Sequence, residues 1–161
     1  MIDQRDEEAS DTLYAVDTDW FDQQNLVFAE LAQARMCESC LERVGEEVEE
    51  RYTVFDQKTG RASFDFRRVP YGADPLNVIR EDCSKKRNYI TPDMPTLEAV
   101  FRVLLANGNA PMRLRDIREQ LAEWCPGGGC QWLLLPADQL ERVIRNDRFY
   151  GIRPRDVAAA A

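Results

Sequence analysis

Apolar residues recur every three or four positions in three segments of the C-terminal half, which is the spacing of helices with one buried face. The first segment starts at Thr96 and ends at Asn107-Gly108-Asn109, the second starts at Leu114, and the third follows Pro136-Ala137-Asp138. The apolar positions are Leu97, Val100, Phe101, Leu104 and Leu105, then Leu114, Ile117, Leu121 and Trp124, then Leu140, Val143 and Ile144. The pattern predicts three short helices, with an extended link at 110–113 and a strand at 149–153.

A comparable spacing begins after Asp19, which suits a helix N-cap, and continues to Val48. It predicts one long amphipathic helix in which Cys37 and Cys40 share a face with Leu41. Alternatively, the helix ends near Met36 and the two cysteines form the turn to a second helix at 41–50. The sequence leaves both arrangements open.

Between these regions, residues 51–55 and 62–67 are rich in aromatic and β-branched side chains. They flank a loop that begins at Asp56 and ends at Gly60, which predicts a β-hairpin. Two strands alone are marginally stable, so we expect the hairpin to pack on a helix or to extend a sheet. A short helix is expected at about 76–82.

These elements indicate an α+β fold that is mainly helical. We expect residues 1–18 to be a disordered acidic tail, residues 19–90 to form a helix and hairpin region, residues 91–155 to form a second domain, and residues 156–161 to be a disordered tail.

The net charge of −8 is unevenly distributed along the 161 residues. Residues 1–50 carry 15 acidic and 3 basic side chains, whereas residues 51–161 carry 14 acidic and 18 basic side chains. The overall acidity argues against strong nonspecific binding of nucleic acid, although the N-terminal part can screen a mildly basic C-terminal part. No apolar run is long enough to span a membrane, and the acidic start is unlike a secretory signal, so we expect a cytoplasmic protein.

Five cysteines and no histidine limit the chemistry of the chain. Cys37 and Cys40 form one close pair, and Cys125 and Cys130 form another, with Pro126 and three glycines in the turn between them. Four thiolates are the ligand set of a structural zinc site. We therefore predict zinc at Cys37, Cys40, Cys125 and Cys130, with Cys83 as a substitute ligand, as a staple that joins the two halves of the chain.

Three other interpretations of the cysteines stay open. Thiolates also ligate iron–sulfur clusters, so four of the five cysteines can serve that purpose. A disulfide within either close pair would make a redox switch. The cysteines can also be ordinary core and surface residues.

The sequence contains no recognisable catalytic motif. The run at 127–129 is not followed by the Lys-Ser/Thr pair of a phosphate-binding loop, and four thiolates would close the coordination shell of the metal. We therefore expect no enzymatic activity and no small-molecule substrate.

Residues 97–105 and 110–117 are similar to the opening of winged helix-turn-helix modules of the HARE type, which occur in chromatin and restriction proteins. An apolar helix is followed there by a proline-containing link and a helix that starts basic-x-Ile, here Arg115-Asp116-Ile117. The resemblance covers about a third of the chain. It implies a winged-helix-like three-helix bundle at 91–155, into which this sequence inserts the two-cysteine glycine turn at 125–132.

The resemblance also implies binding of DNA or of a protein, with the third helix facing nucleic acid. The basic candidates there are Arg142, Arg145 and Arg148, interspersed with Asp138, Glu141 and Asp147. The adjacent bases Lys85, Lys86 and Arg87 are further candidates for phosphate contacts. The sequence as a whole predicts a non-enzymatic regulatory module with structural zinc that binds a protein or DNA. The alternative is an iron–sulfur or thiol-based redox sensor.

Overall fold

The computed structural model describes residues 11–155 as a mixture of helices and strands. The expectations for residues 1–10 and 156–161 lie outside the described residues. In chain order the elements are β1 (Leu13–Val16), α2 (Thr18–Gln23), α3 (Phe28–Gln33), α4 (Glu38–Glu42), β2 (Glu47–Phe55), β3 (Ala62–Pro70), α5 (Pro75–Glu81), η1 (Cys83–Lys85), α6 (Thr96–Ala106), β4 (Met112–Arg113), α7 (Leu114–Glu123), α8 (Gln131–Leu134), α9 (Ala137–Arg145) and β5 (Ile152–Arg155).

A three-stranded antiparallel sheet joins the start of the described chain to its end. β1 is the central strand, with β4 on one side and β5 on the other. Tyr14, Ala15 and Val16 of β1 are buried, because both edges of the strand are paired and its side chains enter the core. The expected disorder of residues 1–18 therefore does not apply to β1, whose short apolar run LYAV is stabilised by partners distant in sequence.

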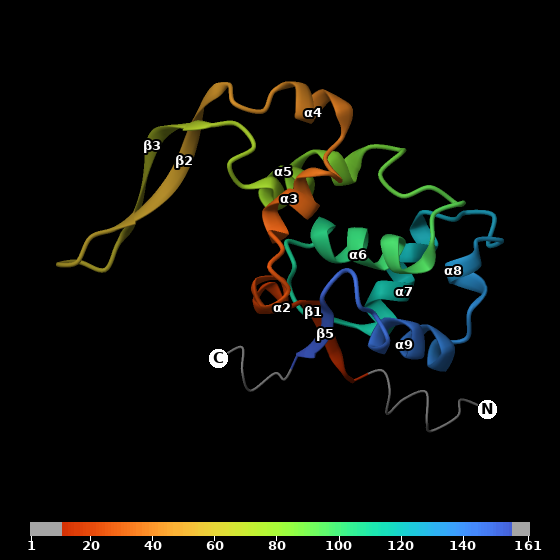
Figure 1. Cartoon of the computed structure of the whole chain (residues 1–161). Helices are drawn as coiled ribbons and strands as arrows, with labels where there is room; N and C mark the ends of the chain where they lie inside the picture. Colours follow the sequence, from red (N-terminus) through yellow and green to blue (C-terminus); the bar gives the residue numbers. More distant parts are fainter. Residues whose placement is uncertain (1–10, 156–161) are drawn as a thin grey trace.

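The helices of the C-terminal half surround α6, which lies at the centre of the molecule (Figure 1). Val100, Phe101, Leu104 and Leu105 of α6 are buried, and the apolar stripes of α7 and α9 also belong to the core. The predicted helices at the three C-terminal segments are confirmed. The predicted link at 110–113 contains β4, whereas the predicted strand at 149–153 overlaps β5 only at residues 152–153, because the strand begins after Gly151. The short helix α8, whose Trp132 is buried, was not predicted.

The predicted hairpin is confirmed as β2 and β3, which pair from Glu47–Pro70 at the base to Phe55–Ala62 at the tip. We call these two strands and their loop, residues 47–70, the arm. It projects from the rest of the molecule (Figure 1), and most of its side chains are exposed. The expectation that the hairpin packs along a helix or extends a sheet is therefore wrong for most of its length.

The expected long helix from Asp19 is divided into α2, α3 and α4. Asn25 has a positive φ of 57°, which ends α2, and Cys37 is extended between α3 and α4. Gly45 has a φ of 93° and precedes β2. The structure thus resembles the alternative in which the helix stops near Met36, except that a strand and not a second helix occupies 47–50.

No helix among residues 11–155 combines the length and the apolar character needed to cross a membrane.

Candidate metal centre

Three cysteines that are dispersed in sequence meet where α4 approaches η1. Cys37 is the N-cap residue of α4, Cys40 lies within α4, and Cys83 is the first residue of η1. The turn after Met36 and the end of α5 direct the two segments toward each other. The centre therefore joins the segment before the arm to the segment after it.

The three sulfur atoms lie within 4.8 Å of one another. The Sγ atoms of Cys37 and Cys83 are 3.4 Å apart, and the backbone N–H of Cys37 donates a hydrogen bond of 3.2 Å to Sγ of Cys83. Thiolates bound to one tetrahedral zinc ion lie about 3.8 Å apart, since each Zn–S bond is about 2.3 Å. The cluster has the size and the donor atoms to hold a metal ion.

Lys86 places a positive charge beside the cluster. Its Nζ donates to Sγ of Cys37 at 2.9 Å and lies 3.3 Å from Oδ1 of Asp82. Burial raises the pKa of Cys37, but hydrogen bonds with Lys86, Ser39 and Cys40 outweigh burial and lower this pKa to about 6. Cys37 is therefore the member of the cluster that most readily becomes a thiolate.

The other two thiols are more deeply placed. Burial raises the pKa of Cys83 to about 12 and also raises the pKa of Cys40. The side chains of Tyr71 and Asp82 lie beside Cys40 and also act on its pKa, which Tyr71 lowers and Asp82 raises. Without a metal ion, Cys40 and Cys83 therefore favour the protonated thiol. A bound cation would favour the thiolate instead, because a metal ion stabilises its ligand thiolates.

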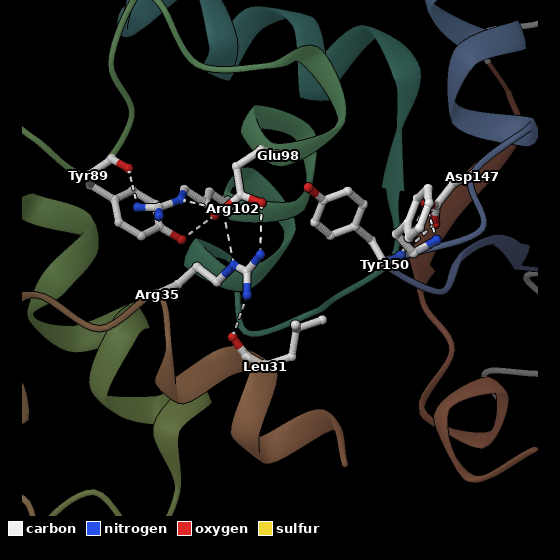
Figure 2. A network of polar contacts seen from close by, with 8 residues as sticks. Leu31, Arg35, Tyr89, Glu98, Arg102, Asp147 and Tyr150 are labelled. Carbon is white, nitrogen blue, oxygen red and sulfur yellow. Dashed lines mark hydrogen bonds and ion pairs between the residues drawn. The ribbon is translucent and has the colours of Figure 1, made fainter. Parts of the chain in front are cut away.

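A pocket of about 540 Å³ opens beside the cluster and is lined by Cys37, Cys83 and Lys86, among others. Arg35 and Arg102 line it as well, and both belong to the polar network of Figure 2. The hydrogen bonds of this network hold both guanidinium groups in place at the edge of the pocket.

Glu98 is the acceptor at the centre of this network. Its two carboxylate oxygens accept hydrogen bonds of 3.0 and 2.9 Å from Arg35, and Arg102 donates a further bond of 3.0 Å (Figure 2). Arg102 also donates to the carbonyl of Tyr89. The network connects α3 to α6 and the chain before α6, and so it supports the wall of the pocket.

The second close pair of cysteines is not part of this centre. Cys125 and Cys130 are bonded to each other as a disulfide, with their Cα atoms 6.2 Å apart, and both are buried. Among the described residues, the group with metal-ligand spacing consists of Cys37, Cys40 and Cys83. The predicted set of Cys37, Cys40, Cys125 and Cys130 is corrected accordingly, because the glycine turn folds Cys125 and Cys130 onto each other, and Cys83 is a principal member rather than a substitute.

The predicted basic candidates have different surroundings. Arg142, Arg145 and Arg148 are all exposed, and Arg145 also donates hydrogen bonds to Glu141 and to the hydroxyl of Tyr14. Lys85 and Arg87 are also exposed, and Lys86 is hydrogen-bonded within the metal centre.

Sequence reasoning missed the contact of Lys86 with the Cys37 sulfur, because the sequence shows only a run of three bases. Its position three residues after Cys83 at the end of a short helix was the available signal.

Comparisons with protein-family models, with curated proteins and with solved structures find no match for this chain.

Proposed function

We propose that this protein is a non-enzymatic regulatory module in which Cys37, Cys40 and Cys83 hold a structural zinc ion, and that it binds a macromolecular partner. The observation that carries the proposal is the convergence of three sulfur atoms within 4.8 Å from two segments more than forty residues apart. Soft thiolate ligands select zinc or iron–sulfur clusters over magnesium and calcium.

The cluster with metal-ligand spacing supplies three ligands, Cys37, Cys40 and Cys83, and in this proposal the neighbouring Asp82 carboxylate moves toward them to become the fourth. The Asp82 carboxyl is hydrogen-bonded to the Cys40 thiol, and that contact lowers the pKa of Asp82 below its usual value, with Lys86 adding to the effect. Carboxylate oxygen is an accepted zinc ligand beside sulfur. Lys86 would then balance part of the negative charge of three thiolates and one carboxylate.

The zinc ion would fix the base of the arm. Tyr71 and residues 45–46 exchange backbone hydrogen bonds there, from Gly45 to the carbonyl of Tyr71 and from Tyr71 to the carbonyl of Glu46. The side chain of Tyr71 lies beside Cys40, which contributes with burial to raising the pKa of Tyr71 to about 12. A metal ion at the cluster would thus hold the arm in one orientation relative to α5.

Thermal unfolding tests the structural role of zinc. The melting temperature of the purified protein should fall by several degrees when a strong chelator removes the metal, and it should recover when zinc is added back. A melting temperature that is the same with and without chelator would exclude zinc as a structural element.

The winged-helix resemblance of residues 91–155 supports a macromolecular partner, either a protein or DNA. For duplex DNA the exposed Arg142 and Arg148 near α9 are the proposed phosphate contacts. Replacing both with Gln should weaken DNA binding and reduce its salt dependence. Equal binding by the double variant would remove α9 from the proposal.

A redox sensor is the second candidate, favoured by the disulfide Cys125–Cys130 and by the 3.4 Å separation of the Cys37 and Cys83 sulfur atoms. An iron–sulfur cluster would give the purified protein a brown colour and visible absorption. A colourless protein containing zinc would decide against the iron–sulfur form of that candidate.

A further inference from the structure

Two sulfur atoms of the metal centre lie close enough to form a bond with each other. Sγ of Cys37 and Sγ of Cys83 are 3.4 Å apart, and a disulfide bond is about 2.0 Å long, so the two atoms need to approach by only about 1.4 Å. The backbone N–H of Cys37 donates to Sγ of Cys83 and keeps that sulfur beside residue 37. The geometry therefore suits a covalent bond between Cys37 and Cys83 as well as a shared metal ion.

The three thiols of the cluster differ in their access to solvent. Cys40 and Cys83 are buried, with exposed fractions of 2% and 1%, whereas Cys37 is partly exposed. Cys37 and Cys83 line the pocket of about 540 Å³, and Cys40 does not. A small reactant that enters the pocket therefore meets the Cys37 sulfur first, with the buried Cys83 sulfur next to it.

Lys86 supplies a proton donor at the same place. Its Nζ donates to Sγ of Cys37 at 2.9 Å, and Lys86 also lines the pocket. When a thiolate attacks a peroxide, the departing oxygen leaves as hydroxide, and an ammonium group beside the sulfur is placed to donate a hydrogen bond to it. Hydrogen peroxide is small and uncharged, so it can reach Cys37 without a charged surface to attract it.

We propose that Cys37 is a site of oxidation by hydrogen peroxide, and that Cys83 converts the oxidised sulfur into a Cys37–Cys83 disulfide. A partly exposed cysteine with a second thiol beside it is the arrangement in which sulfenic acid condenses to a disulfide before it is oxidised further. The inference adds regulation to the proposed function. It rests on that function for the zinc ion, but the pair of sulfur atoms does not depend on the metal.

The reaction has two steps. The Cys37 thiolate attacks one oxygen of hydrogen peroxide, so that an S–O bond forms, the O–O bond breaks and hydroxide leaves; Cys37 becomes a sulfenic acid. The Cys83 thiolate then attacks the Cys37 sulfur, so that the S–S bond forms, the S–O bond breaks and a second hydroxide leaves. The two sulfur atoms lose two electrons, the peroxide gains them, and two protons from solvent convert the hydroxides into two water molecules.

The disulfide would release the zinc ion. It removes two of the three clustered thiolates, and Cys40 and Asp82 alone are too few ligands for a closed tetrahedral site. The base of the arm would then lose its metal ion, although the new bond would still join the segment before the arm to the segment after it. A thiol reductant would restore both thiolates, so the change would be reversible.

Peptide mapping of the full-length, zinc-loaded protein after treatment with hydrogen peroxide tests the proposal. A glutamate-specific protease cuts after Glu38 and so separates Cys37 from Cys40. We expect the peptide 31–38 to be cross-linked to the peptide that carries Cys83, and most of the bound zinc to be released to an indicator dye. A dithiol reductant should reverse both changes. The Cys125–Cys130 disulfide is already formed and serves as an internal reference.

Three single variants separate the roles of the cysteines. Cys83→Ser should form no disulfide and should accumulate sulfenic acid on Cys37, trapped by dimedone several-fold more than in the unmodified protein. Cys37→Ser should give no dimedone adduct on Cys83. Cys40→Ser is the matched control, because it keeps both reacting sulfur atoms and should still form the Cys37–Cys83 disulfide.

A disulfide between Cys37 and Cys40, oxidation of Cys37 only to the sulfinic acid, or three free thiols after treatment with peroxide would overturn the proposal. Metal analysis of the starting sample distinguishes its failure from failure of the zinc proposal. A zinc-free protein that forms the Cys37–Cys83 disulfide would refute the structural zinc ion and sustain the inference about the two sulfur atoms. A zinc-loaded protein that keeps its thiols and its zinc in peroxide would refute the inference and leave the zinc proposal in place.

Discussion

Lys86 donates a hydrogen bond from its Nζ to Sγ of Cys37 at 2.9 Å, across 49 residues of sequence. The same ammonium group lies 3.3 Å from Asp82, so it bridges the sulfur cluster and the neighbouring carboxylate. A cation in this position compensates the negative charge of several thiolates bound to one divalent ion. Substitution of a group that is hydrogen-bonded to a metal ligand commonly lowers metal affinity.

Lys86→Gln should therefore weaken metal binding about 10- to 100-fold without removing a ligand. Competition with a chelator of known affinity measures the change. Lys85→Gln is the matched control, because Lys85 is exposed and adjacent in sequence. An equal effect of both substitutions would indicate a general loss of positive charge rather than the specific contact to Cys37.

Cys83→Ser and Cys125→Ser should have different effects. Cys83→Ser removes one of the clustered sulfur atoms and should lower metal affinity at least 100-fold. Cys125→Ser breaks the disulfide with Cys130 and should destabilise the fold by about 2 kcal/mol, given the short loop that it closes. It should leave metal affinity nearly unchanged.

Cobalt(II) titration, followed through the thiolate-to-metal absorption, compares the two variants. Loss of cobalt binding in Cys125→Ser, with retention in Cys83→Ser, would contradict the assignment of the centre.

Local patterns were sufficient to predict the three C-terminal helices and the hairpin. Their apolar periodicity and turn residues are strong signals, and the helices that bury Phe101, Leu121 and Ile144 need no distant information to be recognised. In contrast, β1 has only four residues and is stabilised by strands β4 and β5 from the far end of the sequence. Its surroundings are polar and acidic, so composition alone indicated disorder.

Only part of the metal centre was predicted from the sequence, because its ligands also come from distant segments. The spacing of Cys37 and Cys40 identified one pair of ligands, but spacing cannot show which distant cysteine joins that pair. The glycine turn that suggested a metal ligand pair at Cys125 and Cys130 is equally suited to closing a disulfide between them. Cys83 carried no local signal, because its place in the cluster depends on how α5, which leads into η1, packs beside α3.

Glu98 predicts a specific dependence of stability on pH. Burial raises the pKa of Glu98, but the hydrogen bonds from Arg35 and Arg102 outweigh burial and hold this pKa below the ordinary value of 4.5. A carboxyl with a lowered pKa in the folded state contributes stability above the unfolded pKa, and that contribution is lost as the pH falls through the folded pKa.

Glu98→Gln should accordingly destabilise the protein by about 2–3 kcal/mol at pH 7, because it leaves two partly buried guanidinium groups without their anion. The difference from the unmodified protein should shrink below about pH 4.3, where unfolded-state glutamates become protonated. Urea unfolding across this range measures the change, with the exposed Glu42→Gln as control. A deficit that is the same at pH 3 and pH 7 would mean that charge is not its cause.

Gly151 should not tolerate a side chain. Its φ is +68°, and an added Cβ would lie 2.8 Å from Cε2 of Phe21 and 2.9 Å from Cε3 of Trp20. Gly151→Ala combines backbone strain with overlap against two rings and should lower stability by about 2–4 kcal/mol. Gly127→Ala is the control, because a Cβ there meets no atom within 4 Å. Similar melting temperatures for both variants would show that the loop at Gly151 adapts.

Elemental analysis of protein purified without added metal tests the central proposal most directly. We predict one zinc ion per chain in the unmodified protein and almost none in Cys83→Ser. A metal-free unmodified protein, or one that contains iron in place of zinc, would contradict the proposal that Cys37, Cys40 and Cys83 hold a structural zinc ion.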